Sequence, residues 1–216
     1  MLELGEKIQN DPWKVLPAIT DDDRQWARAN PGKFQYYVDP DAGRNGKPRW
    51  PEDYRCGWGS DQHGQITRAW VNPDYVPGPT NADMPLTNEF ELVWWRVAHG
   101  HITFERFIEL FSSHRFIMLL PEDDPTGARG WPTQMWHGKP EATLYSSAAQ
   151  LPNDVNPWLR REITGVQVLQ ELCPKEGMGI HINPGKAGVA YTIPGTDLLD
   201  LWRQWLDRNG GRAVTD

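Results

Sequence analysis

The feature that most constrains the fold is a continuous apolar run, RFIMLLP, at residues 115–121. It has the length of a strand, and a strand without polar alternation is buried on both faces, so other layers must cover it. Two helical patterns precede the run, each with apolar residues spaced at i, i+3, i+4 and i+7. These residues are Phe90, Val93, Trp94 and Val97 in the first pattern, and Phe104, Phe107, Ile108 and Phe111 in the second. Helices packed on a mixed sheet, an α/β (α+β) fold, follow from this order.

Weaker patterns predict further elements on both sides of this centre. Thr20 followed by three aspartates begins a helix that stops before Pro31, because acidic residues stabilise the positive end of a helix dipole. Thr164 and Gln167 form a capping-box pattern at the start of another helix, and Asp197 is predicted to cap the last one. Strands are predicted over residues 33–39, 55–61, 66–72, 133–137, 141–147, 179–182 and 189–193.

The segment VNPDYVPGPTNADMP, residues 71–85, is rich in proline and polar residues and is typical of a linker. It predicts a boundary near residue 80. Residues 1–81 then comprise an N-terminal arm, a helix and a β-rich leader that contains tryptophan. Residues 82–216 form the main domain.

The stretch GMGIHINPG, residues 177–185, could be a phosphate loop, a metal-ligand strand or a strand that runs into a turn. A phosphate loop needs its glycines between a strand and the helix that follows. Here the predicted helix comes before the glycines, and another strand comes after them. His181 alternates with two isoleucines, which places it on the opposite sheet face. We therefore interpret the stretch as strand, turn and strand.

Composition limits the partners. The net charge of −7 argues against nucleic acid, because phosphate binding needs a basic face. No apolar run approaches the roughly 18–20 residues of a membrane span, so no membrane insertion is expected. The N-terminus has neither the basic start nor the apolar stretch of a signal peptide, which predicts a cytoplasmic protein. Cys56 and Cys173, the two cysteines, are far apart and are expected to be packed thiols.

The sequence contains few motifs that indicate a catalytic or metal-binding site. No GxSxG occurs, and neither cysteine has a neighbouring histidine in sequence. His99 and His101 could bind a metal, but no acidic or thiol partner lies near them in sequence, and His137 stands apart. We therefore expect no catalytic residues, no metal and no cofactor. A catalytic site assembled in space from distant residues stays open.

Twelve tryptophans are hard to bury completely, and exposed tryptophans are enriched at binding hot spots. Trp95 lies about 100° around its helix from Trp94, so either this helix is buried on two sides or Trp95 faces a partner. The loop after the apolar run carries Glu122, Asp123 and Asp124 and ends near Trp131. We expect these carboxylates and Trp131 to emerge together at one sheet end and to suit a basic protein partner, with Trp136 as a further contact.

The second half of the chain resembles the N-terminal domain of SseB-like proteins, the enhanced-serine-sensitivity family. The resemblance rests on three segments in the family's order: FIELFSSHRFIMLLPED, PEATLYSSAAQLP and GMGIHINPGKAGVAYTI. It implies an SseB-like mixed sheet with helices packed on it. The family offers no catalytic residues to transfer.

The first half resembles the leader of actinobacterial type VII secretion system-associated proteins. The matching positions are Asp39-Pro40, Gly57-Trp58, Asp61, Gly64, Ile66 and Asn72-Pro73-x-Tyr75. Gly59 and Ser60 depart from the expected apolar strand, and Gly78 stands where serine is usual. The two resemblances together imply a non-catalytic adaptor that binds another protein in a type VII secretion locus. The alternative is a cytoplasmic immunity protein that neutralises a secreted toxin.

Overall fold

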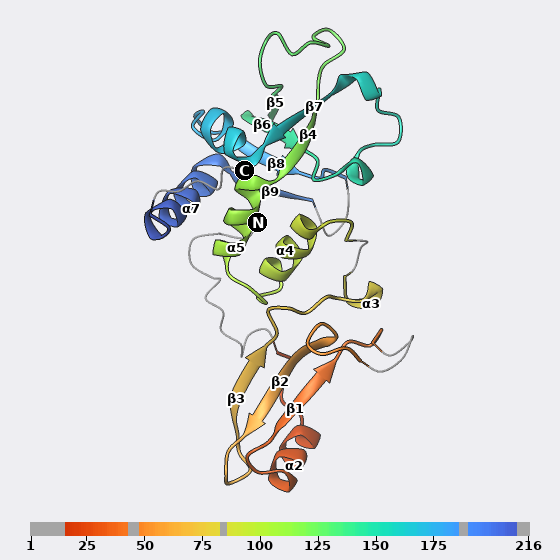
Figure 1. Cartoon of the computed structure of the whole chain (residues 1–216), viewed down its shortest axis with the longest axis vertical. Coiled ribbons are helices and arrows are strands. Elements are labelled where there is room, and N and C mark those ends of the chain that lie inside the picture. Colours follow the sequence, from red (N-terminus) through yellow and green to blue (C-terminus); the bar gives the residue numbers. More distant parts are fainter. Residues whose placement is uncertain (1–15, 43–47, 83–85, 186–189, 211–216) are drawn as a thin grey trace. The chain divides into compact units, whose positions relative to one another are not determined.

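The computed structural model describes residues 16–42, 48–82, 86–185 and 190–210 (Figure 1). Helices and sheets both contribute to it, which confirms the predicted α+β class. Contacts divide the chain into two compact units, residues 1–85 with 95–103 and residues 86–94 with 104–216. The first unit therefore takes in residues 95–103, which the sequence-based division near residue 80 assigned to the main domain.

The first unit contains a three-stranded antiparallel sheet with the strand order β1-β2-β3. Its strands are β1 (Phe34–Val38), β2 (Tyr54–Ser60) and β3 (Ile66–Val71). They agree with the predicted strand and hairpin. A short helix, α3 (Pro79–Ala82), follows where the sequence suggested only an extended linker.

Helix α2 (Asp21–Ala29) lies beside this sheet (Figure 1). Thr20 and Asp23 cap it reciprocally, each side chain accepting from the backbone N–H of the other residue. The core of this unit is small and contains the buried residues Leu16, Cys56 and Trp58, with Tyr37, Ala69 and Val71 packed against them. These strand residues all point to one face of the sheet, so its other face lacks this cover.

Helix α4 (Glu89–Ala98) is buried on two sides. Phe90, Val93 and Val97 are at most 2 % exposed, as the predicted stripe requires. Trp94 and Trp95 are also buried, at 8 % and 4 %. Trp94 stacks on Tyr191 in the second unit, while Trp95 packs against rings of the first unit. The two adjacent indoles therefore serve different cores.

The second unit has the strands β4 (Arg115–Leu119), β5 (Gln134–Trp136), β6 (Lys139–Leu144), β7 (Arg160–Thr164), β8 (Gly179–Ile182) and β9 (Tyr191–Pro194). Strand β4 pairs antiparallel with β7, and the order of the larger sheet is β5-β6-β8-β9. A bridge between Ile117 and Tyr145 joins β4 to the chain just after β6. Strand β4 is thus bonded on both sides, but the predicted burial of both its faces is not met: Phe116 and Met118 are at most 1 % exposed, while Ile117 and Leu119 on the other face are half-buried.

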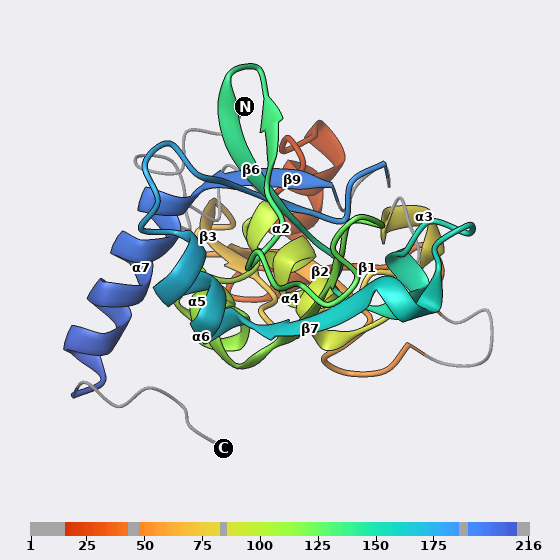
Figure 2. The same cartoon turned by 90° about the horizontal axis from the view of Figure 1, so that it is seen from above.

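The helices of the second unit are α5 (Phe104–Ser113), α6 (Gly165–Gln167), η3 (Val168–Leu172) and α7 (Gly195–Arg208), with single turns η1 (Ala148–Gln150) and η2 (Pro157–Leu159). Helix α5 contacts α6 and α7, and α7 also contacts η3; Figure 2 shows α7 beside them. Thr164 and Gln167 form the predicted capping box, but the helix continues as the π-helical η3. Helix α7 begins at Gly195, so Asp197 lies in its first turn and is not its cap.

Successive residues of a strand point to opposite faces of a sheet, and in the larger sheet this places apolar side chains on one face and polar side chains on the other. Ala142, Leu144, Ile180, Ile182 and Ile193 are fully or almost fully buried. His181 points to the opposite face, as predicted, and is half-buried there beside Glu141. Residues 186–189 lie outside the described residues, and of the predicted strand 189–193 the structure shows β9 from Tyr191 onward.

Candidate functional site

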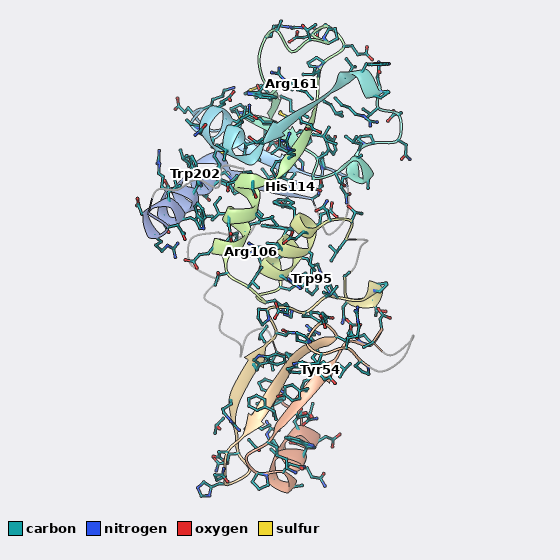
Figure 3. All side chains as sticks on the ribbon, in the orientation of Figure 1. Tyr54, Trp95, Arg106, His114, Arg161 and Trp202 are labelled. Carbon is teal, nitrogen blue, oxygen red and sulfur yellow. The ribbon has the colours of Figure 1, made fainter. Side chains whose placement is uncertain are left out.

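The face of the β1-β2-β3 sheet opposite its core carries a cluster of aromatic rings. Register pairs Phe34 with Gly59 and Tyr36 with Gly57, and these glycines pair in turn with Arg68 and Trp70. Directly paired residues in an antiparallel sheet share a face. Tyr54, labelled in Figure 3, and Trp50 complete the cluster. We call this surface the aromatic face; it consists of Phe34, Tyr36, Trp50, Tyr54, Arg68 and Trp70.

The rings of the aromatic face contact one another. Tyr36 lies edge-on to Trp50, Tyr54 and Trp70, with ring centroids 5.5, 6.0 and 5.5 Å away. Trp50 and Trp70 are nearly parallel, at 15° and 5.6 Å. Trp50 is nevertheless 59 % exposed and Tyr36 43 % exposed. A contiguous exposed aromatic surface of this kind is typical of a binding site.

Two glycines of β2 make room for these rings. A Cβ on Gly59 would lie 2.8 Å from ring carbons of Phe34 and 2.9 Å from Cβ of Arg68. A Cβ on Gly57 would lie 2.7 Å from the carbonyl oxygen of Gln35 and 3.1 Å from the ring of Tyr36. Since no real Cβ approaches so closely, the rings on β1 lie over β2 only because these positions are glycine.

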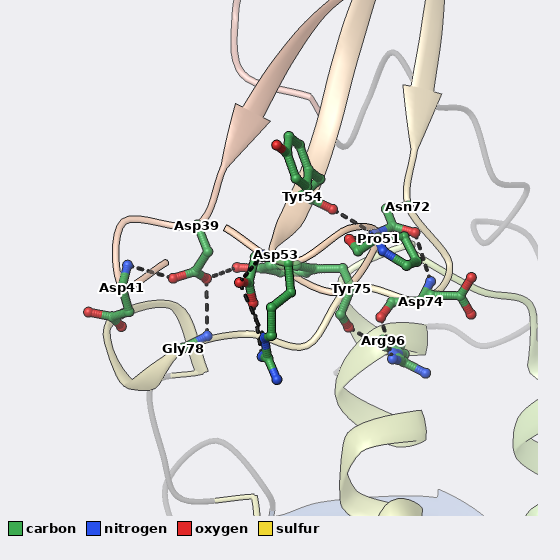
Figure 4. Close-up of polar contacts among 11 residues, drawn as sticks. Asp39, Asp41, Pro51, Asp53, Tyr54, Asn72, Asp74, Tyr75, Gly78 and Arg96 are labelled. Carbon is green, nitrogen blue, oxygen red and sulfur yellow. Dashed lines mark hydrogen bonds and ion pairs between the residues drawn. The ribbon is translucent and has the colours of Figure 1, made fainter. Parts of the chain in front are cut away.

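A polar network fixes the end of this sheet, and it uses residues on which the leader resemblance rests (Figure 4). The Asp39 carboxylate accepts from the Tyr75 hydroxyl, from the backbone N–H of Gly78 and from Asn81 Nδ2. Burial by itself would raise the pKa of Asp39, but the hydrogen bonds, first that from Tyr75, hold this pKa below its usual range. Burial, together with the same hydrogen bond, raises the pKa of Tyr75. Asp39 and Tyr75 thus shape the scaffold.

Asn72 and Arg96 extend this network (Figure 4). The Asn72 side chain donates to the carbonyls of Pro51 and Tyr54, both at 2.7 Å. Arg96 donates from Nε to the Tyr75 carbonyl at 2.9 Å. The loop that carries Trp50 is thereby tied to β2 and to α4. A rigid base of this kind holds the aromatic face in one conformation.

The three predicted carboxylates lie in different surroundings. Asp124 is buried, and it accepts from the backbone N–H groups of Ala128 and Arg129 at 2.9 and 3.0 Å. Asp123 is exposed and forms an ion pair with Arg129 at 2.8 Å, which lowers the pKa of Asp123. Glu122 is exposed. The loop therefore uses two of its three carboxylates on its own backbone and on Arg129.

The three predicted tryptophans lie in different surroundings. Trp131 is half-buried; its Nε1 donates to a Glu171 carboxylate oxygen at 2.5 Å, and the Arg161 guanidinium lies 4.3 Å from its ring centroid. Trp136 is 58 % exposed at the tip of the β5–β6 hairpin. Trp95 is buried, so its ring is not available to a partner as a surface residue.

A buried polar network holds the N-terminus of α4 to the end of β6. The Glu91 carboxylate is 1 % exposed and accepts from Ser146 Oγ at 2.6 Å and from Gln150 Nε2 at 2.8 Å. It also accepts from the backbone N–H and hydroxyl of Thr87. Asn183, from the NPG turn, accepts from the backbone N–H of Ser146 at 2.8 Å. Because these donors satisfy the carboxylate, the network stabilises the fold.

A shallow groove of about 350 Å³ lies on the polar side of the larger sheet. Pro121, Pro132 and Pro184 line it together with Thr143 and Glu141. Glu141 is the charged residue among the described residues of its lining. Thr143 pairs in register with His181, whose Nδ1 lies 3.8 Å from a Glu141 carboxylate oxygen, and the Thr143 hydroxyl accepts from Gln134 Nε2 at 3.4 Å.

His101 and both cysteines are buried, whereas His99 and His137 are exposed. Nδ1 of His99 lies 2.8 Å from the Trp95 carbonyl oxygen, and Nδ1 of His101 lies 2.8 Å from that of Asn72. Burial raises the pKa of Cys56 to about 11 and that of Cys173 to about 12, as expected for packed thiols. Nowhere in the described ranges do three His, Cys, Asp or Glu side chains gather as metal ligands would.

Comparisons with known proteins add no identity. Scans of protein families, of curated proteins and of solved structures each found nothing that matches this chain. Among the described helices, none combines the length and apolar character that a membrane crossing requires.

Sequence reasoning did not single out the aromatic face. The signal was nevertheless present in the alternation of Phe34 and Tyr36 on one strand and of Arg68 and Trp70 on another. Period two places each pair on a single face. Tyr37 and Trp58 obscured this pattern, because they make the opposite face aromatic as well.

Proposed function

We propose that this protein is a non-catalytic binding protein that recognises another protein through the aromatic face. The supporting observation is a contiguous set of rings, with Trp50 and Tyr36 exposed and the others half-buried, on a sheet whose opposite face is its core. Tyrosine and tryptophan supply large contact area at a small cost in side-chain entropy, which is why they dominate binding hot spots. The polar network around Asp39 supports this reading, since a fixed scaffold reduces the ordering cost of binding.

The proposed setting is a type VII secretion locus, with the protein in the cytoplasm. This part of the proposal rests on the resemblance of the leader, whose Asp39, Asn72 and Tyr75 build the scaffold beneath the aromatic face. An adaptor would bind a secretion component or a secreted substrate. The alternative, an immunity protein, would bind a toxin and inhibit it.

Affinity capture from the native host tests the proposal. The bait is the full chain, compared with Trp50→Ala and with Tyr36→Thr, which keeps a β-branched residue in the strand. Trp158→Ala is the matched control, because Trp158 is 86 % exposed but lies outside the aromatic face. Circular dichroism establishes that each variant is folded.

We expect one protein to be captured by the full chain and by Trp158→Ala, and to be lost with both face variants. The purified partner should then bind the purified chain with at least about tenfold loss of affinity on Trp50→Ala, as for a hot spot. Inhibition of that partner's own toxicity would select the immunity role. Equal binding by wild type and both face variants would refute the aromatic face as the site.

A further inference from the structure

The aromatic face also carries information about the chemistry of its ligand. We propose that it binds an extended, proline-rich segment that carries an acidic residue. This inference rests on the proposed function and names the class of partner segment. Three properties of the face support it: its free hydrogen-bond donors, the shape of its rings and the charge at one end.

The polar tips of the face are unused donors. Within the described part of the chain, the indole N–H groups of Trp50 and Trp70 and the hydroxyls of Tyr36 and Tyr54 have no hydrogen-bond partner; the described indole–side chain bonds are those of Trp58 and Trp131. Proline contributes a carbonyl acceptor and no N–H donor. A run of prolines therefore matches a surface that presents ring faces and donors, and it leaves no donor of its own unsatisfied.

The rings suit a polyproline II helix in shape and in entropy. Trp50 and Trp70 lie nearly parallel, and Tyr36 stands almost perpendicular to both, so the surface has ridges of different orientation. Aromatic surfaces of this kind bind proline-rich segments, because the polyproline II conformation is already ordered before binding. Little conformational entropy is then lost on association.

Charge defines one end of the segment. Arg68 is the charged side chain that the paired strands place on this face, and it is exposed while its guanidinium lies 4.7 Å from the Phe34 ring centroid. Its Nη2 donates to the carbonyl oxygens of Ser60 and Gly32, at 2.7 and 3.4 Å, and among the described residues these neutral acceptors leave its charge without a carboxylate in hydrogen-bond contact. At the other end, Arg49 is already paired with Asp53 at 3.0 Å. The whole chain has a charge of −7, but salt screens charges beyond about 8 Å. The Arg68 guanidinium therefore determines which charge is favoured on a segment bound beside it. A carboxylate next to the prolines would lie at Arg68.

A carbohydrate is the main alternative for stacked aromatic rings. Sugar hydroxyls are donors as well as acceptors, so a sugar also needs acceptors on the protein. The described side-chain acceptors of the aromatic face are the hydroxyls of Tyr36 and Tyr54; its side chains include no carboxylate or amide, and Asp53 beside Trp50 is held by Arg49. The hydrogen-bonding groups therefore favour a proline-rich ligand.

Binding of synthetic peptides to the full chain tests this proposal. The probe is acetylated hexaproline flanked by glutamates; the comparisons are the same peptide flanked by lysines, neutral hexaproline and a glycine–serine peptide of equal length. Chemical shifts of the tryptophan indole N–H groups report binding, with assignments from Trp50→Ala, Trp70→Phe and Trp158→Ala.

We expect the glutamate-flanked peptide to shift the Trp50 and Trp70 signals saturably while the Trp158 signal stays in place. Trp50→Ala should weaken this binding at least about tenfold. Arg68→Gln should lower the affinity for the glutamate-flanked peptide by about threefold to fivefold and leave the affinity for neutral hexaproline unchanged. On the wild type, the lysine-flanked peptide should bind more weakly than the glutamate-flanked one, which checks the charge without any variant.

Several results would overturn the proposal. Equal shifts with the glycine–serine peptide would mean that the face binds chains without regard to proline. A self-association that Trp50→Ala abolishes, measured by ultracentrifugation, would make a second copy the occupant. If no proline peptide binds while the cellular partner is still lost with Trp50→Ala, this inference fails and the proposed function stands. If the cellular partner is also unaffected, both fail.

Discussion

Acid should destabilise the first unit through His101. This side chain is 4 % exposed, stacks on Tyr75 with ring centroids 5.1 Å apart, and has its Nδ1 at 2.8 Å from the Asn72 carbonyl oxygen. Burial lowers its pKa from 6.5 to about 4, with smaller contributions from Arg55, His99 and Arg96, while the hydrogen bond to Asn72 acts in the opposite direction.

The direction of the effect follows from proton linkage. Between about pH 6.5 and pH 4 the unfolded chain binds a proton at His101 and the folded chain does not, so the free energy of unfolding falls as the pH falls. The contribution is fully present above pH 6.5 and is lost by about pH 4. A pKa difference of this size corresponds to about 3 kcal/mol. That is a large fraction of the stability of an ordinary domain.

Urea unfolding followed by circular dichroism from pH 7.5 to pH 4 measures this effect. His101→Asn is the comparison, because an amide can still donate to the Asn72 carbonyl but does not titrate. We expect the variant to be less stable at pH 7, where it lacks the stacked ring, and to lose about 3 kcal/mol less than the wild type on acidification. The pKa of His114 is also lowered, by burial, but it titrates in both proteins and cancels. Parallel pH profiles for the two proteins, or an NMR titration of His101 near pH 6.5, would refute the reasoning.

Three further substitutions have predictable outcomes. Gly165→Ala should cost more than about 3 kcal/mol in urea unfolding, because its Cβ would lie 1.6 Å from the Phe111 carbonyl oxygen; a loss below 1 kcal/mol would contradict this contact. Tyr75→Phe should lower the free energy of unfolding by about 1–3 kcal/mol and raise the pKa of Asp39, because the carboxylate loses the hydroxyl donor. NMR titration measures this pKa, and an unchanged value would mean that the hydroxyl is not the main donor. Glu91→Ala should cost about 2–4 kcal/mol, since it leaves several buried donors without an acceptor, and a thermal melt like that of the wild type would show that these donors find water.

The predicted helices and hairpins were found because their signals are local. Apolar spacing placed Phe90, Val93 and Val97 on one face of α4, and capping residues located the starts of α2 and α6. The predicted cap of α7 lies three residues after the observed cap, Pro194, because Asp197 can stabilise the first turn without being the cap. Alternation also placed His181 on the face opposite the two isoleucines of β8.

The candidate site was less accessible to sequence reasoning, since exposure depends on contacts between distant residues. Asp124 was grouped with its acidic neighbours, but its carboxylate turns inward to backbone N–H groups. Trp95 was a surface candidate, but Tyr75 and His101 cover it from other segments of the chain. Glu91 gave no signal, because the donors that satisfy it include Ser146 and Gln150, more than fifty residues away.

The sequence by itself determined the α+β class, the amphipathic faces and the supply of tryptophan, because periodicity and composition act over a few neighbouring residues. Only the tertiary structure decided which rings reach the surface. Trp58 and Trp70 lie on neighbouring strands of one hairpin, yet one is 2 % exposed and the other belongs to the aromatic face. Strand register sets this difference: one indole points toward the core that contains Leu16, and the other pairs with Gly57 across the sheet. A one-residue change in the register of β3 would turn Trp70 toward the core face, and no local sequence signal measures that choice.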